Sequence, residues 1–214
     1  MTPSTAVKGR PLPSTDRRGK RLFDLVLALA LALPAFGACL VFAVLIRLVD
    51  RSSPLFRQER VGRLGRPFLL YKLRTMRADS PNLPTHESSA SHVTPLGRFL
   101  RRTKIDELPQ LINVLRGDMS FVGPRPCLPG QLDLIHRREE LGVSTLRPGI
   151  TGVSQIVGLD MSQPAALATN DATYLRPWSL RIDLAILSRT FLGGGSGDAL
   201  FVSEIRRDRD TQDK

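Results

Sequence analysis

The chain has 214 residues, and its 31 Lys and Arg against 20 Asp and Glu give a formal net charge of +11 at pH 7. A hydrophobic share of 42% argues against disordered and fibrous classes, and the length fits one domain with appendages. The two cysteines, Cys39 and Cys127, exclude a disulfide-dense secreted scaffold and lie in no zinc-binding cluster. A chain this basic favours a negatively charged partner, which can be nucleic acid, an anionic lipid surface or a phosphorylated small molecule.

The N-terminal region combines a basic arm with a long apolar run. Residues 1–19 contain prolines and basic residues and are predicted to form a flexible arm. The run from Leu25 to Ile46 has no formally charged residue, and at about 1.5 Å per residue a helix of this length reaches the thickness of a bilayer core, roughly 30 Å. Pro34 lies near its middle and lacks a backbone N–H, so we expect a break or kink there.

The charges that flank the apolar run favour one topology. Residues 1–21 and residues 47–66 are both rich in Lys and Arg, and such flanks prefer the cytoplasmic side of a membrane. A straight span would place one flank outside, whereas a helix-break-helix that enters and leaves by the same leaflet satisfies both. We therefore predict a re-entrant membrane hairpin over residues 20–50. A single straight span, a buried soluble helix and a cleaved signal peptide are the alternatives.

Residues 51–192 are predicted to form a cytosolic catalytic domain, with a charged tail at 193–214. Two short strands, Leu55–Val61 and Pro67–Leu73, are expected on either side of a glycine-containing turn. A helix is expected to end near Gly117, and another over Pro177–Leu192. Apolar residues at helical spacing predict both helices: Leu108, Leu111, Ile112 and Leu115 for the first, and Leu180, Leu184, Leu187 and Phe191 for the second. The predicted class is α+β, mainly helical, with a short β-hairpin.

Asp106 and Glu107 are adjacent carboxylates at the start of the first of these helices. One interpretation is structural: Asp106 caps the helix and Glu107 lies in its first turn, since both favour the positive end of the helix dipole. The other is chemical, with one carboxylate acting as a nucleophile or metal ligand and its neighbour handling a proton or a second metal contact. A covalent carboxylate route for phosphoryl transfer needs cations nearby.

Cationic residues surround this pair in the sequence. Arg125 lies between two prolines and Arg147 precedes Pro-Gly, so both guanidinium groups sit on stiff turns that suit phosphate binding. Lys72 and Arg74 alternate along the second predicted strand and share one face, which is either solvated or in contact with phosphate. Ordinary surface charge is the alternative for each. A nucleic-acid partner is disfavoured, because the chain has one Trp, two Tyr and a membrane segment.

Several segments of the chain closely resemble, in the same order, the bacterial sugar transferase family. They are the proline-broken apolar run and the four blocks Lys20–Asp24, Tyr71–Met76, Ile105–Pro126 and Arg147–Gly152. Within this family, the chain resembles the small monotopic phosphoglycosyl transferases. The resemblance implies a re-entrant hairpin that holds the catalytic domain against the inner leaflet of the bacterial cytoplasmic membrane, facing the cytoplasm. It implies transfer of a sugar phosphate from a nucleotide sugar, usually UDP-linked, to polyprenyl (undecaprenyl) phosphate, the step that initiates exopolysaccharide, O-antigen, capsule or glycoprotein glycan assembly.

By the same resemblance, Asp106 attacks the sugar-bearing phosphate and forms a phosphosugar-enzyme intermediate. Mg²⁺ sits by Asp106 and Glu107, with Glu107 assisting in binding or proton management, while Arg125 and Arg147 match phosphate-binding turns. Direct transfer without a covalent intermediate and a non-catalytic membrane scaffold remain the alternatives. The sequence leaves the sugar and the oligomeric state open, and it is compatible with a homo-oligomer.

Overall fold

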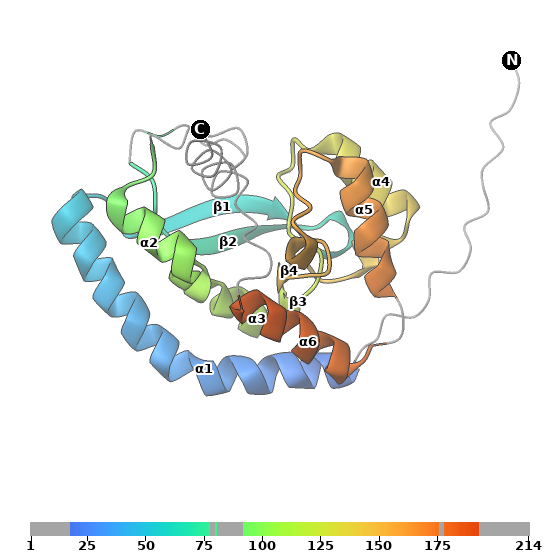
Figure 1. Cartoon of the computed structure of the whole chain (residues 1–214), viewed down its shortest axis with the longest axis horizontal. Helices are drawn as coiled ribbons and strands as arrows, with labels where there is room; N and C mark the ends of the chain where they lie inside the picture. The colour runs from blue at the N-terminus through green and yellow to red at the C-terminus, as the bar shows by residue number, and fades with distance from the viewer. Residues whose placement is uncertain (1–17, 78–79, 81–91, 176–177, 193–214) are drawn as a thin grey trace, which may run out of the picture.

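The structure is a computed structural model that describes residues 18–77, 80, 92–175 and 178–192. The described part is mostly helical with a small β-hairpin, as predicted (Figure 1). The helices are α1 (Arg18–Leu45), η1 (Ile46–Asp50), η2 (Arg63–Gly65), α2 (Pro95–Thr103), η4 (Ile105–Gln110), α3 (Leu111–Arg116), α4 (Leu132–Glu140), η5 (Val143–Thr145), η6 (Gln155–Val157), α5 (Pro164–Ala172), η7 (Thr173–Leu175) and α6 (Leu180–Phe191). The strands are β1 (Leu55–Val61), β2 (Pro67–Leu73), β3 (Ser120–Val122) and β4 (Gly149–Thr151).

The β1–β2 hairpin has the boundaries that the sequence predicted. The strands are antiparallel and pair Leu55 with Leu73 and Gln58 with Leu70. Because side chains alternate across a strand, Gln58 and Leu70 point to the packed face and are both buried. Lys72, which lies on this same face two residues after Leu70, reaches η4.

A second, two-stranded sheet was not predicted. β3 and β4 pair in parallel, with Ser120 opposite Gly149 and Val122 opposite Thr151. The chain segments approach so closely here that a Cβ on Gly149 would lie 2.1 Å from the backbone nitrogen of Gly123. Only glycine fits at such a position. The sheet therefore brings the turns after Val122 and before Gly149 into direct contact.

Helix α1 carries the apolar run and continues through Pro34 to Leu45. The structure thus shows one continuous, bent helix, in agreement with the kink that was one of the two expectations for Pro34, and it does not show a break into two separate arms (Figure 1). The reason is that a proline removes a single helical hydrogen bond and forces a kink, which a long helix tolerates. Within the described residues, this helix together with η1 is the one that is long and apolar enough to cross a membrane.

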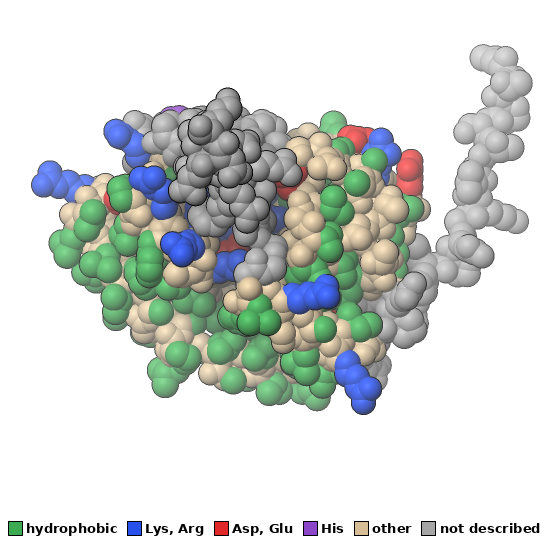
Figure 2. All heavy atoms as spheres, viewed as in Figure 1, with side chains coloured by type: hydrophobic (Ala, Val, Ile, Leu, Met, Phe, Trp, Pro, Cys, Tyr) green, Lys and Arg blue, Asp and Glu red, His purple; other side chains and the backbone are tan. Residues whose placement is uncertain are grey.

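Most of α1 is exposed, although small residues on one side join the core. Ala28 and Ala35 are buried, while Leu33 and Phe36 are 81% and 69% exposed. Figure 2 shows hydrophobic side chains gathered over the lower and left part of the view, where α1 lies. An exposed apolar face of this extent marks a surface for protein or lipid.

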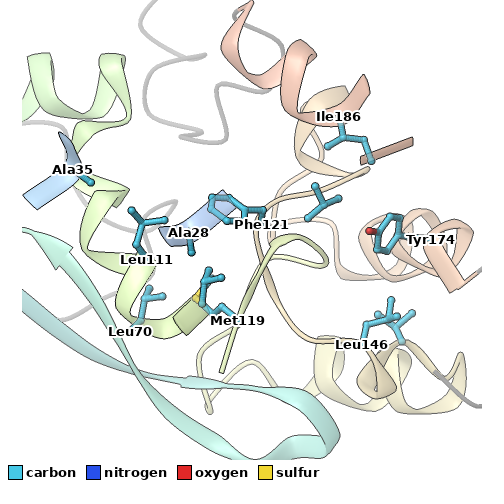
Figure 3. Packing of buried hydrophobic residues seen from close by; sticks show 12 residues of the cluster. Ala28, Ala35, Leu70, Leu111, Met119, Phe121, Leu146, Tyr174 and Ile186 are labelled. Atoms are coloured by element: carbon cyan, nitrogen blue, oxygen red, sulfur yellow. The ribbon is translucent and has the colours of Figure 1, made fainter. Parts of the chain in front are cut away.

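The main core joins α1 to the catalytic segments. Figure 3 shows side chains from α1, β2, α3 and β3 meeting around Ala28, Leu70, Leu111 and Phe121. A separate cluster beneath η1 contains Ile46 with two further buried leucines, Leu73 and Leu100. The helix that carries the apolar run is therefore part of the folded body at both of its ends.

The two predicted helices exist, but their faces differ from the expected ones. α3 ends at Gly117, which adopts a left-handed φ of 91°. The turn before it is a 3₁₀ helix that contains Pro109. On α6 the buried residues are Asp183 and Ile186, whereas Leu184 and Phe191 of the apolar stripe are exposed. The packed side of α6 is set by a buried ion pair of Asp183.

The predicted tail, residues 193–214, and residues 1–17 of the predicted arm (1–19) lie outside the described residues, whereas Arg18 and Gly19 belong to α1 and not to a flexible arm.

Candidate active site

The Asp106–Glu107 pair lies on the short 3₁₀ helix η4, directly after α2. Helix α2 begins at the Thr94 cap, whose hydroxyl accepts a hydrogen bond from the Gly97 N–H at 2.9 Å. It ends at Lys104, a non-glycine residue with φ 58°. A left-handed conformation costs about 1 kcal/mol for such a residue and is typical of functional segments. This turn redirects the chain so that Asp106 points inward, with 6% of its surface exposed.

Cations from two distant segments meet the pair. Lys72 Nζ from β2 lies 2.9 Å from Glu107 Oε1 and 4.0 Å from Asp106 Oδ2. Arg125 Nη1 lies 3.7 Å from the same oxygen of Glu107. The structure therefore brings together four of the predicted site residues, Asp106, Glu107, Lys72 and Arg125.

The charges around Glu107 keep it ionised. Burial alone would raise its pKa, but Lys72, Arg125 and Lys104 together lower the pKa below the usual glutamate value. Burial likewise lowers the pKa of Lys104, and the two carboxylates only partly oppose this effect. The site thus holds the buried carboxylate of Asp106 and the half-buried carboxylate of Glu107 among several cations, an arrangement suited to a further anion.

The backbone of the Arg125 turn is held from behind. Arg138 donates from Nη1 to the carbonyl oxygen of Arg125 at 2.8 Å, and Arg138 itself forms a buried ion pair of 2.6 Å with Asp171 of α5. Arg60 of β1 donates from Nη1 to the carbonyl oxygen of Pro126 at 3.1 Å. These bonds fix the turn so that the Arg125 guanidinium stays near Glu107. Sequence reasoning did not single out Arg60 or Arg138.

Asn113 ties the hairpin to the helix after the pair. Its Oδ1 accepts from the N–H of Tyr71 at 3.2 Å, and its Nδ2 donates to the carbonyl of Leu69 at 2.7 Å. Because Asn113 is fully buried, these bonds form away from water and are costly to break. They set the register of Lys72 against η4.

Arg147 and Arg74 have other contacts. Arg147 Nε donates to the carbonyl oxygen of Gly117 at 2.9 Å and so caps the C-terminus of α3. Arg74 follows the end of β2, donates from Nε to the carbonyl of Ser53 at 2.8 Å and lies over the Phe56 ring at 5.8 Å. The structure gives both arginines backbone or ring contacts at the rim, and their phosphate-binding role stays a prediction.

The carboxylates and cations together form a charged site, of a kind that suits a phosphate group, in a body that also carries a long apolar helix. The sequence model of a protein family described as bacterial sugar transferase matches residues 15–194 of the chain. The chain belongs to this family, which confirms the resemblance and the prediction of a sugar transferase.

Individual relatives agree with the family. A UDP-glucose:undecaprenyl-phosphate glucose-1-phosphate transferase of Caulobacter vibrioides is 44% identical over 197 residues, covering 85% of this chain and 72% of that protein. An undecaprenyl-phosphate glucose phosphotransferase of Komagataeibacter xylinus is 38% identical over 202 residues, covering 87% of this chain and 37% of that protein. A sugar transferase of Bacillus subtilis named EpsL is 39% identical over 171 residues, 80% of this chain and 84% of that protein.

Proposed function

We propose that this protein transfers a sugar 1-phosphate from a nucleoside diphosphate sugar, UDP-linked in the simplest case, to polyprenyl phosphate in a membrane. The relatives from Caulobacter vibrioides and Komagataeibacter xylinus are named as transferases acting on undecaprenyl phosphate. The observation that carries the proposal is the buried Asp106 carboxylate, 4.0 Å from Lys72 and beside the Glu107–Arg125 pair. Such a transfer would begin the assembly of a bacterial surface polysaccharide.

The reaction proceeds in two displacements at phosphorus. An Asp106 oxygen attacks the sugar-bearing phosphorus, a new P–O bond to the carboxylate forms, and the P–O bond to the nucleotide breaks with release of UMP. A polyprenyl phosphate oxygen then attacks the same phosphorus and breaks the bond to Asp106, which is regenerated. The charges balance in both steps without a net proton transfer. Lys72 and Arg125 stabilise the phosphate oxygens, and Glu107 holds these two cations in place.

The carboxylate pair fits Mg²⁺ as a shared ligand set. In the part of the chain that the structure describes, no group of three or more His, Cys, Asp or Glu side chains is arranged to hold a metal ion. Mg²⁺ is commonly bound by one or two carboxylates together with substrate phosphates and water. Asp106 and Glu107 would provide the protein ligands and the donor diphosphate the others. When bound, the ion would neutralise charge on the phosphates.

The contacts of α1 support a monotopic arrangement. At one end Arg21 Nη1 donates to the carbonyl of Val114 at 2.6 Å. Beyond the other end, Asp50 at the end of η1 accepts a hydrogen bond from the Thr94 hydroxyl at 3.0 Å. Both ends are thus held by the same folded body, and a straight transmembrane span would separate them by a bilayer. The bent helix instead lies in one leaflet with its exposed apolar face toward lipid, and the basic flanks favour the cytoplasmic leaflet.

The test is the intact mass of the full chain in membrane mimetics after incubation with Mg²⁺ and a panel of UDP-sugars, without acceptor. A mass increase of one sugar phosphate, absent in Asp106→Asn, is expected. If no adduct forms but UMP appears once polyprenyl phosphate is added, transfer is direct and the covalent step is wrong. If neither signal appears with any donor, the protein is a non-catalytic relative or uses a donor outside the panel.

A further inference from the structure

Arg60 lies on the same face of the hairpin as Lys72. Lys72 pairs across the strands with Phe56, and Gln58 and Arg60 follow Phe56 at intervals of two residues along β1. Cross-strand partners and alternate residues share one face of a sheet. The face that presents Lys72 to the carboxylate pair therefore also carries Arg60, further along the strand.

The contacts of Arg60 leave its charge uncompensated. Nη1 donates to the Pro126 carbonyl at 3.1 Å, and Nη2 donates to the side-chain oxygen of Gln58. Both partners are neutral oxygens. The third nitrogen, Nε, is buried and has no hydrogen-bond partner among the described residues. A buried donor without a partner is rare in folded proteins and calls for a physical explanation.

A second guanidinium lies close by. Arg125 is the residue before Pro126, and burial together with the charge of Arg125 lowers the pKa of Arg60 to about 10. Two neighbouring guanidinium groups are unfavourable unless an anion lies between or beside them. Guanidinium groups match phosphate oxygens in a two-pronged geometry. An anion with two phosphates would pair with both arginines.

The order of the contacts assigns the two phosphates. Arg125 Nη1 is 3.7 Å from Glu107 Oε1, whereas Arg60 donates to the Pro126 carbonyl and forms no ion pair with Asp106 or Glu107 among the described residues. The sugar-bearing phosphate has to reach Asp106, and the nucleotide phosphate lies one bridging oxygen further away. Resting on the proposed function, we infer that Arg60 binds the nucleotide phosphate of the donor and Arg125 the sugar-bearing phosphate. Arg60 thereby stabilises the charge that builds up on the departing nucleoside monophosphate.

The test compares the binding of UMP and UDP to the full chain in detergent micelles with Mg²⁺, by titration calorimetry. UMP has only the nucleotide phosphate, whereas UDP has both. Arg60→Met is expected to weaken UMP and UDP alike, by about 10- to 100-fold each, the range for a charged hydrogen bond. Arg125→Met is expected to weaken UDP by a similar factor and to change UMP by less than about twofold.

Arg57→Met provides the matched control. Arg57 lies on the same strand but on its opposite face, exposed, with its guanidinium over the Tyr71 ring at 6.0 Å. The Arg57→Met variant removes one positive charge from β1, as Arg60→Met does, and is expected to bind both nucleotides with the affinity of the wild type. Arg60→Lys keeps the charge without the two-pronged geometry, and its nucleotide affinity should fall between those of the wild type and Arg60→Met. Thermal unfolding of each variant verifies that it is folded.

Three outcomes would overturn the assignment. If Arg60→Met weakens UDP and leaves UMP unchanged, Arg60 acts only by holding the Arg125 turn. If Arg60→Met binds both nucleotides with the same affinity as Arg57→Met and the wild type, Arg60 has no part in donor binding. If the wild type binds neither nucleotide, the proposed donor class itself fails and the inference falls with it, a result that is distinct from the other two.

Discussion

Lys20 is the centre of a buried ion network that joins the first turn of α1 to α6, and its removal should destabilise the protein strongly. Its Nζ lies 2.9 Å from Asp24 Oδ1 and 2.8 Å from Asp183 Oδ2. All three residues are buried, with 6%, 1% and 0% of their surfaces exposed in the order Lys20, Asp24, Asp183. Two carboxylates therefore depend on one ammonium group at a place shielded from bulk solvent.

The substitution Lys20→Met keeps most of the side-chain volume and removes the charge. Breaking a buried ion pair by removing one partner costs about 3–5 kcal/mol. We expect the lower end, roughly 3 kcal/mol, because each carboxylate keeps two neutral donors. These donors are Ser120 Oγ and Phe121 N for Asp24, and the Tyr174 hydroxyl and Trp178 Nε1 for Asp183. For a chain of this size, such a loss lowers the melting temperature by about 6–12 °C.

The assay is thermal unfolding of the full chain in micelles, followed by the fluorescence of Trp178, the single tryptophan, which donates to Asp183 at 2.9 Å. The matched control is Arg137→Met. Arg137 forms an ion pair with Asp133 at the same 2.9 Å, but their side chains are 44% and 58% exposed. An exposed pair contributes at most about 1 kcal/mol. Equal shifts for the two variants would refute the argument that burial gives the Lys20 network its weight.

Three further predictions concern packing, charge and thiol reactivity. Gly97→Ala should destabilise the protein by about 1–3 kcal/mol in chemical unfolding, because a Cβ there would lie 2.0 Å from the Thr75 carbonyl, whereas Gly130→Ala, with open space, should change stability little. The pKa of Glu107 is lower in the folded protein than in the unfolded chain, so the charged carboxylate stabilises the fold at pH values above the unfolded pKa. This stabilisation is lost as the pH falls through the folded pKa. The difference in the free energy of unfolding between the wild type and Glu107→Gln should therefore narrow on acidification, and a constant difference would contradict this prediction. Burial raises the Cys127 pKa, so native protein should resist alkylation at Cys127 near neutral pH and react after unfolding, as peptide mass mapping can show.

Local patterns predicted the local structure well. The β1–β2 hairpin has the predicted boundaries, because alternation and a glycine-containing turn act over neighbouring residues. β3 and β4 each have three residues and pair across the long separation between Ser120 and Gly149. Strands this short have no readable period, so a sequence pattern cannot reveal them. On α6 the periodic leucines predicted a packed stripe, but a buried Asp183 shows that an ion pair can decide which face packs.

The candidate site was predictable where its residues are contiguous. Asp106 and Glu107 stand in one motif, and the turn around Arg125 is marked by its two prolines. Arg60 is one of many arginines between residues 47 and 66 and has no such mark. Its place beside Arg125 depends on the hairpin register and on the tertiary contact of β1 with the Pro126 turn. The composition gives the number of cationic residues, whereas only the fold determines which of them lie close to one another and to the carboxylates.

The C-terminus of α3 shows why the apolar helix and the catalytic segment form one unit. The last carbonyls of a helix need donors, and basic groups there also meet the negative end of the helix dipole. Arg21 of α1 donates to the carbonyls of Val114 and Leu115, and Arg147 donates to that of Gly117. Helix α3 continues directly from η4, which carries Asp106. Helix α1 and the segment that carries Asp106 are therefore joined through α3 by side-chain hydrogen bonds to its last carbonyls.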